Sequence, residues 1–242
     1  MHSRENEVHE LSRGVSLIII RYFKGRCSVM FNDGHVRHNV GYGEILRKEV
    51  KNYYHPTVKG VGYLGEANDP LKTRTKNSKA RRVWYSMFNR CYSGKYRTYE
   101  EMSVCEEWHN FQNFAKWFEE NYNPKTMEKW ELDKDVLIKG NKVYSPETCC
   151  FIPHEINKLI LRSRSDKGLY PRGVWKLQSK FISEIIIDDK KKRLGTFSTY
   201  EEAFLEYKKA KEANIKDVAN RWRSVIPKAA YDSLCTYEVT RE

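Results

Sequence analysis

Residues 173–204 read GVWKLQSKFISEIIIDDKKKRLGTFSTYEEAF, and this stretch decides the fold of the C-terminal part of the chain. Runs of β-branched and aromatic residues predict strands over 173–177, 180–187 and 193–197. The short turns between them are predicted at 178–179 and 188–189. Ser198 and Thr199 then cap a helix whose first turn holds Glu201 and Glu202, where the helix dipole favours acids. We therefore expect three antiparallel strands packed on one amphipathic helix, with the other face of the sheet free.

The N-terminal part alternates between apolar and polar residues in the manner of β-strands. Apolar alternation predicts strands over 15–22, 27–31 and 35–42. Between the last two lies Asn32-Asp33-Gly34, a strong hairpin signal because glycine supplies the positive φ that such a turn requires. Residues 1–65 are therefore predicted to form a small β-rich module, followed by a linker over 66–78.

The central part mixes helical and strand patterns. Residues 83–91 carry apolar side chains at helical spacing, and a second such stripe runs from Trp108 to Phe118. Short apolar runs between Leu132 and Ile152 indicate a hairpin, and residues 153–161 follow as a helix that opens on proline. The whole chain is thus expected to be an α+β protein. Its parts are the β module, a central hairpin–helix domain with flanking helices over 79–165, the three-stranded sheet plus helix over 170–225, and a C-terminal tail over 226–242.

The charge of the chain favours a polyanionic partner. The 44 Lys and Arg residues outnumber the 32 Asp and Glu residues, which leaves a formal net charge of +12 over 242 residues. Residues 71–97 contain basic side chains but no acid, so Arg81 and Arg82 in this run are candidates for phosphate contacts. No apolar run reaches the length of a membrane helix, and six cysteines without an export signal suggest a cytoplasmic protein with reduced thiols. Double-stranded DNA is the expected partner and a membrane is not.

The C-terminal stretch resembles the AP2 DNA-binding domain over most of its length. The residues that carry the likeness are 172–174, 180–185, 194–197 and 199–203. In that family the three-stranded sheet lies in the major groove, whose width of ~12 Å admits such a ribbon. The resemblance implies that five residues at sheet-face or turn positions contact DNA, namely Arg172, Trp175, Lys180, Lys191 and Arg193. The alternative is that Trp175 belongs to the core and the lysines only solubilise the surface.

The central part resembles HNH-type proteins of phages and bacteria, including homing endonucleases that pair the nuclease with an AP2 domain. The likeness covers about residues 80–160. It rests on Trp84, Arg90-Cys91-Tyr92, residues 104–108, Phe111, Phe114, residues 132–135, 140–141 and 144–149, and Asn157. HNH nucleases place a hairpin and a helix around one divalent metal, with a histidine at the end of the first strand as general base. The resemblance therefore implies a metal-dependent DNA endonuclease, with site residues at Asp133, Lys134, Asp135, Asn141 and Asn157.

The chain departs from the HNH pattern at its general base. Lys134 stands where the histidine is expected, and lysine is protonated near neutral pH. Asp133, Asp135 and Asn157 still offer the oxygen ligands that Mg²⁺ or Mn²⁺ would use. The same two carboxylates would alternatively serve as capping or salt-bridge groups. Of the nearby imidazoles, His109 is expected on a helix flank and His154 at a helix start.

Two further features bear on the range of functions. Cys91, Cys105, Cys149 and Cys150 lack the C-x-x-C spacing of structural zinc sites, so we expect buried thiols and no structural zinc. The segment 98–135 is rich in acids and would suit docking on a host protein. Beside a phage-type HNH/AP2 nuclease, the sequence is therefore compatible with a non-catalytic DNA-binding regulator and with a phage-encoded inhibitor of a host nucleic-acid enzyme.

Overall fold

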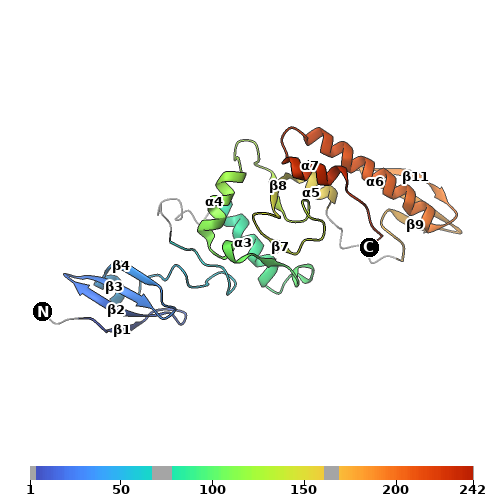
Figure 1. The fold of residues 1–242 in the computed structure, drawn as a ribbon. Helices are drawn as coiled ribbons and strands as arrows, with labels where there is room; N and C mark the ends of the chain where they lie inside the picture. The colour runs from blue at the N-terminus through green and yellow to red at the C-terminus, as the bar shows by residue number, and fades with distance from the viewer. Residues whose placement is uncertain (1–3, 67–77, 161–168, 242) are drawn as a thin grey trace. The chain divides into compact units, whose positions relative to one another are not determined.

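The structure is a computed structural model that describes residues 4–66, 78–160 and 169–241 (Figure 1). The chain divides into two compact units, residues 1–118 and residues 119–242, and each is described by itself. The predicted α+β class is confirmed, with an antiparallel sheet near the N-terminus and a three-stranded antiparallel sheet plus helix near the C-terminus. None of the helices in the described ranges combines the length and the apolar character that crossing a membrane requires.

The first unit opens with a four-stranded antiparallel sheet in the order β1-β2-β3-β4. Its strands are β1 (Val8–Glu10), β2 (Ser16–Phe23), β3 (Arg26–Phe31) and β4 (Val36–Gly41), followed by the short helix α1 (Tyr42–Leu46). The predicted turn at residues 32–34 joins β3 to β4, and Gly34 has a φ of 87° there. The sequence pattern missed β1, which has three residues, and α1, which has five, because neither is long enough to show a period.

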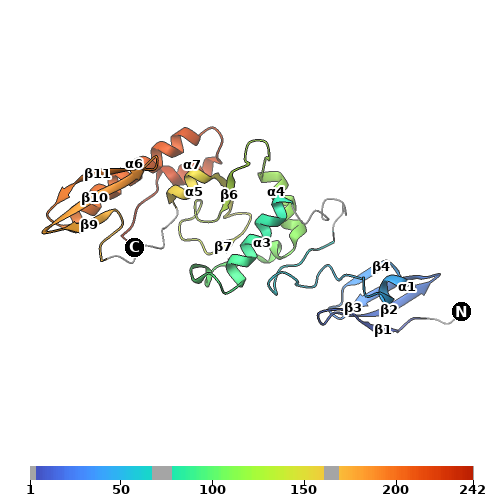
Figure 2. The same ribbon diagram turned by 180° about the vertical axis from the view of Figure 1, so that it is seen from behind.

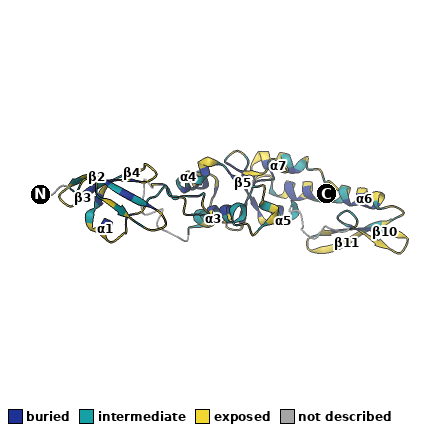
Figure 3. Cartoon of the chain, turned by 90° about the horizontal axis from the view of Figure 1, so that it is seen from below, coloured by how far each residue is buried: buried dark blue, intermediate teal, exposed yellow. Residues whose placement is uncertain are grey.

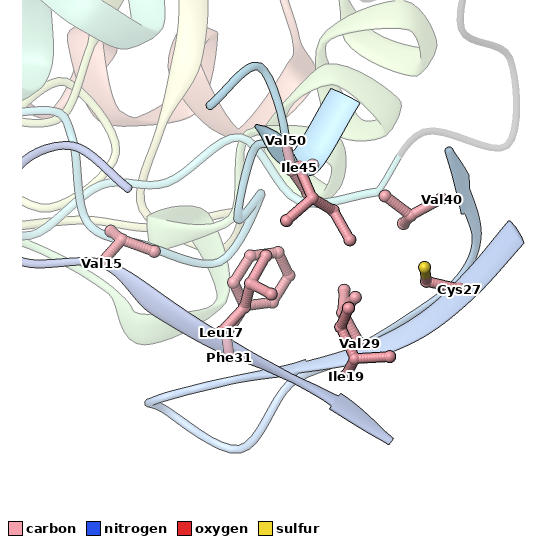
Figure 4. Close-up of a cluster of buried hydrophobic side chains, with 9 residues drawn as sticks. All are labelled: Val15, Leu17, Ile19, Cys27, Val29, Phe31, Val40, Ile45 and Val50. Carbon is pink, nitrogen blue, oxygen red and sulfur yellow. The ribbon is translucent and has the colours of Figure 1, made fainter. Parts of the chain in front are cut away.

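One face of this sheet buries an apolar cluster (Figure 4). The cluster consists of Val15, Leu17, Ile19, Cys27, Val29, Phe31, Val40, Ile45 and Val50. Alternate residues of β2 and β3 enter it, as expected when one face of a sheet is buried. Ile45 of α1 also enters it, so the short helix packs on the sheet.

The rest of the first unit is mainly helical. It contains α3 (Lys79–Tyr92), the 3-10 turns η1 (Arg97–Tyr99) and η2 (Glu106–His109), the two-residue strand β5 (Ser103–Val104) and α4 (Phe111–Asn121), whose last three residues belong to the second unit. The predicted second helix therefore begins at Phe111, and Trp108 lies in η2 before it. Trp84 Nε1 donates to the backbone oxygen of Trp108 at 2.7 Å, and both indoles are fully buried. The two apolar stripes thus form core, as expected.

The second unit begins with the predicted hairpin and helix. Strands β6 (Trp130–Asp133) and β8 (Cys150–Pro153) pair antiparallel, with β7 (Val143–Tyr144) in the connection between them. Helix α5 (His154–Ile160) follows directly after β8. The register places Asp133 opposite Cys150 and Trp130 opposite Pro153. The strands are joined by a long connection in place of a tight turn, and the loop in this connection holds several predicted site residues.

The three predicted C-terminal strands are present as β9 (Val174–Leu177), β10 (Lys180–Ile187) and β11 (Lys190–Phe197). They form an antiparallel sheet in the order β11-β10-β9, joined by two-residue turns at the predicted positions. Asp188 and Asp189 have φ of 50° and 58°, the left-handed conformation that suits a tight hairpin between twisted strands. β11 starts three residues earlier than predicted, because residues 190–192 pair with the end of β10.

Helix α6 (Tyr200–Trp222) covers one face of this sheet (Figure 2). Thr199 is its N-cap, as predicted. The Thr199 hydroxyl accepts from the Glu202 backbone N–H, and the Glu202 carboxylate accepts from the Thr199 backbone N–H, which completes a capping box. Val174, Ile185 and Phe204 lie in the buried cluster between sheet and helix. The opposite face of the sheet is left without a covering helix in the described part of this unit.

The end of α6 and a further helix, α7 (Lys228–Cys235), pack beside the hairpin–helix. Trp222 Nε1 donates to Glu155 Oε2 at 2.8 Å, and the rings of Trp222 and Trp130 meet edge to face. Ser233 Oγ of α7 donates to the backbone oxygen of Val136. The segment expected as a tail thus contains a helix, because its apolar residues bury against partners far away in the sequence.

Candidate nucleic-acid interface and hairpin–helix site

Four of the residues predicted to contact DNA lie on the face of the β9–β11 sheet that is turned away from α6. Directly opposed residues in an antiparallel pair share a face, as do alternate residues along a strand. The opposed pairs on this face are Leu177–Lys180, Trp175–Ile182, Ile182–Thr196, Glu184–Arg193 and Ile186–Lys191. The register therefore brings Trp175, Lys180, Lys191 and Arg193 together on one surface, here called the outer sheet face.

The outer sheet face combines cations with exposed apolar groups. Lys180, Lys191 and Arg193 are exposed, and Figure 3 colours most of β11 as exposed. Trp175 is 41% exposed, which excludes the alternative that its indole belongs to the core. Its Nε1 donates at 3.1 Å to Glu184 Oε2, the acid on this face. Three cations against one hydrogen-bonded acid leave the face positive, with a large ring beside them.

Arg172 lies apart from the outer sheet face. It precedes β9 and borders a cavity that α6 also lines, where its charge helps to lower the pKa of Lys211. The likeness to the AP2 domain gave Arg172 a sheet-face or turn position, and the structure places it in the turn before β9. The turn before β9, in which Gly173 has a φ of 75° and packs on Tyr207 of α6, directs Arg172 toward the helix.

Arg81 and Arg82 belong to the first turn of α3 in the first unit and differ in exposure. Arg82 is exposed, as a phosphate contact requires. Arg81 is half-buried, with its guanidinium 5.9 Å from the centre of the Phe111 ring, and burial lowers the pKa of Arg81. Of the two, Arg82 has the geometry of a surface charge and Arg81 that of a packing residue.

Asp133 ends β6 and caps the loop that follows it. Its Oδ1 accepts from the backbone N–H groups of Asp135 at 2.8 Å and of Val136 at 2.6 Å. Burial raises the pKa of Asp133, and the two N–H donors act in the opposite direction. The carboxylate is thus held in a fixed orientation in a poorly solvated position.

Lys134 is buried with its charge fully compensated. The side chain is 5% exposed, and Nζ donates to both carboxylate oxygens of Asp135 at 2.8 Å and to the backbone oxygen of Asn141 at 2.6 Å. The three hydrogens of an ammonium group match these three acceptors. Lys134 therefore bridges the two ends of the loop as a cation and has no lone pair to accept a proton.

Asn141 closes the same loop from the other side. Its Nδ2 donates to the backbone oxygens of Lys134 at 2.9 Å and of Val143 at 2.6 Å. Asn141 and Lys134 thus bind each other's backbone, and Asp135 completes the network. The alternative roles of the two carboxylates, capping for Asp133 and salt bridging for Asp135, are both present in this loop.

Asn157 lies one turn into α5 and contacts a residue that the sequence pattern did not single out. Its Nδ2 donates to Glu131 Oε2, and His154 Nδ1 lies 3.0 Å from Glu131 Oε1. Glu131 stands two residues before Asp133 on β6, so the two carboxylates share a face of the strand. The Asn157 Oδ1 atom is shielded from solvent and has no hydrogen-bond partner among the described residues.

Glu131 was detectable in principle from its sequence neighbours. Alternation along β6 places it beside Asp133, and the i, i+3 spacing of His154 and Asn157 puts both on one side of α5. What the pattern lacked was the angle at which α5 meets the strand. The packing of α5 on β6 and β8 decides that angle.

The thiols and metal-ligating side chains form no further centre among the described residues. No group of three or more His, Cys, Asp or Glu side chains is arranged there to hold a metal ion. None of the six cysteines, all of which lie in the described ranges, forms a disulfide. Cys149 and Cys150 are buried, whereas Cys91 and Cys105 are half-buried. Burial and the nearby Asp133 charge raise the pKa of Cys150 far above its ordinary value.

Comparisons of this chain with protein-family models, with curated proteins and with solved structures found no match.

Proposed function

We propose that this protein binds double-stranded DNA through the outer sheet face. The observation that carries the proposal is that Lys180, Lys191 and Arg193 share one sheet face with the exposed ring of Trp175, and that α6 leaves this face open. A three-stranded ribbon is narrow enough to enter a major groove ~12 Å wide. Lys191 and Arg193 are two residues apart on β11, which corresponds to ~6.6 Å along the strand.

Each side chain on this face has a distinct expected role. Arginine forms paired hydrogen bonds with guanine, lysine neutralises phosphate, and an exposed indole packs on sugar or base. Arg193 Nη2 donates to Thr196 Oγ1 at 2.6 Å, which holds the guanidinium over the face. The net charge of +12 adds a general attraction for the polyanion.

The test is a salt series of binding measurements on the full chain. Fluorescence anisotropy with labelled duplex DNA should give log K falling linearly with log salt, by ~0.9 for each phosphate neutralised. Lys191→Ala should reduce the steepness of that dependence by ~0.9, the contribution of one neutralised phosphate. Arg193→Ala should weaken binding by ~1–3 kcal/mol at preferred sites and relax preference at one base position. Lys216→Ala, an exposed lysine on α6, is the matched control and should change neither quantity.

A flat salt response would reject DNA as the partner. Uniform weakening of all sequences by Arg193→Ala would reduce that residue to a phosphate contact. If Lys216→Ala weakened binding as much as Lys191→Ala, the attraction would come from net charge and not from the outer sheet face.

We further propose that the hairpin–helix binds Mg²⁺ or Mn²⁺ weakly through Asp133 and Asn157. The observation in favour is the Asn157 Oδ1 atom, which is buried, has no described partner and is the kind of oxygen that these ions take. Asp133 supplies a carboxylate whose raised pKa indicates a cost of keeping it ionised. Asp135 is the weakest of the three predicted ligands, because both its oxygens already accept from Lys134. A bound ion would supply Lewis-acid polarisation of a phosphate group.

The geometry at Lys134 favours DNA binding without efficient cleavage. A general base contributes about 10²–10⁴ in rate, and an ammonium group that donates three hydrogen bonds cannot act as one. Plasmid nicking with Mg²⁺ or Mn²⁺ should therefore be slow or absent in the native chain. Brisk cleavage that Asp133→Ala abolishes would establish a nuclease instead. If Lys134→His leaves nicking silent while DNA binding persists, the hairpin–helix is a binding platform.

A further inference from the structure

A cavity of about 470 Å³ lies in the second unit where α5 and α6 meet one end of the C-terminal sheet. It is bordered by both helices, by Arg172 before β9 and by the Asp188–Asp189 turn. This volume falls within the range of small-ligand sites, which is ~300–1,000 Å³.

Two cations meet in this cavity. Lys211 of α6 is half-buried beside Arg172, and its ammonium has no hydrogen-bond or ion-pair partner among the described residues. A partly buried ammonium without a partner is costly, because water solvates its charge less well than at the surface. Lysine and arginine side by side increase that cost by mutual repulsion.

The acids that border the cavity are mostly engaged elsewhere. Asp189 accepts from Lys158 Nζ at 2.6 Å. Glu155 pairs with Arg221 at 2.9 Å and also accepts from the Trp222 indole. Asp188 remains, and it is exposed at the tip of the turn. The positive charge of Lys211 is therefore left uncompensated by the described acids around it.

We propose that this cavity binds a phosphate group through Lys211 and Arg172. A phosphate dianion offers acceptors to both cations at once, and the Asn214 side chain at the cavity wall can add a neutral hydrogen bond. The phosphate belongs either to the DNA backbone or to a small phosphorylated molecule. This site goes beyond the proposed DNA-binding function and does not depend on it.

The protonation of Lys211 gives the proposal a signature in pH. Burial, with a contribution from Arg172, lowers the pKa of Lys211 to about 8. A bound anion favours the protonated amine, so affinity should be highest below pH 8 and fall as pH rises through that value. Lys158, the other lysine at the cavity, is paired with Asp189.

The experiment uses inorganic sulfate as the probe, because its charge does not change between about pH 6 and 9. NMR titration of the full chain should show saturable shifts of amide signals around Lys211 at about pH 7. Lys211→Gln should weaken sulfate binding about tenfold or more. Lys211→Arg should retain binding and lose the decline above pH 8. Lys216→Gln, on another side of α6, is the matched control and should leave the affinity unchanged.

The same titration decides between the two sources of phosphate. Displacement of sulfate by duplex DNA, together with a reduced salt slope in Lys211→Gln, assigns the site to the DNA backbone. Tighter binding of adenosine monophosphate than of sulfate, without displacement by DNA, assigns it to a small phosphorylated ligand. Equal sulfate affinity in the native chain and in folded Lys211→Gln would overturn the proposal, as would the absence of saturable shifts.

Discussion

Replacement of Lys134 by methionine should loosen the loop between β6 and β8. Methionine keeps most of the buried aliphatic length but removes the ammonium, and with it the hydrogen bonds to Asp135 and to the backbone oxygen of Asn141. Removing one partner of a buried ion pair costs ~3–5 kcal/mol when the other charge stays buried. Asp135 is 47% exposed and regains water, so we expect the low end of that range, about 3 kcal/mol.

Asp135→Asn tests the same bridge from its other end. In this variant Lys134, which is 5% exposed, faces an amide in place of a carboxylate. We expect a loss of free energy of unfolding similar to that of Lys134→Met. The double variant should lose ~1.5–3 kcal/mol less free energy of unfolding than the two single variants lose together. The reason is that the second change removes a charge that the first left unpaired.

Native-state hydrogen exchange of the β6 and β8 amides is the appropriate assay, because it reports this hairpin separately from the first unit. Lys129→Met, an exposed lysine just before β6, is the control and should change the opening free energy by less than about 0.5 kcal/mol. A Lys134→Met effect as small as the control, or full additivity in the double variant, would refute the bridging role.

Three other outcomes are expected from the second unit. Asp133→Asn keeps the Oδ1 acceptor of the cap and removes a carboxyl whose pKa is raised by burial, so it should raise the urea midpoint of the unit at pH 7. In the unfolded chain Asp133 ionises at its ordinary pKa, so the raised pKa destabilises the folded state only above that pH. The increase in urea midpoint caused by Asp133→Asn should therefore shrink as pH falls toward about 4. Cys150 should be the last thiol alkylated by iodoacetamide in the native protein, since burial keeps it protonated, and rapid labelling would contradict its placement. Gly173→Ala should lower the free energy of unfolding by ~2–4 kcal/mol, because φ is 75° and a Cβ would overlap the Tyr207 ring. Gly140→Ala is the control: φ is 77° but the space around it is open, so the loss should be only ~1 kcal/mol.

The elements that the sequence predicted well are those whose cause is local. The two-residue turns at 178–179 and 188–189, the β10 bounds and the Thr199 cap follow from residues within a few positions of each other. The outer sheet face follows only in part, because a register shift at Ser183–Glu184 breaks the alternation between β10 and β11. Alternation therefore predicts the shared face of Trp175 and Lys180, whereas the register shift decides that Arg193 and Lys191 join them.

The remainder depended on contacts between distant segments. The resemblance to HNH proteins suggested a site at residues 133–135, but it could not show that Lys134 is bound at both ends of a loop. The resemblance gave Arg172 a sheet-face or turn position, but it could not show that the turn at Gly173 brings Arg172 to Lys211 on α6. Asn157 meets Glu131 only because α5 packs against β6.

By itself, the sequence determined the α+β class, the strands and helix of the C-terminal sheet and the excess of positive charge, since these depend on composition and on periods of two and 3.6 residues. The tertiary structure decided which charges are compensated: Lys134 by Asp135 and Asn141, Lys158 by Asp189, and Lys211 by none of the described residues. The physical reason is that the free energy of a charge depends on its burial and on partners within a few ångströms, and both are set by segments far apart in the chain.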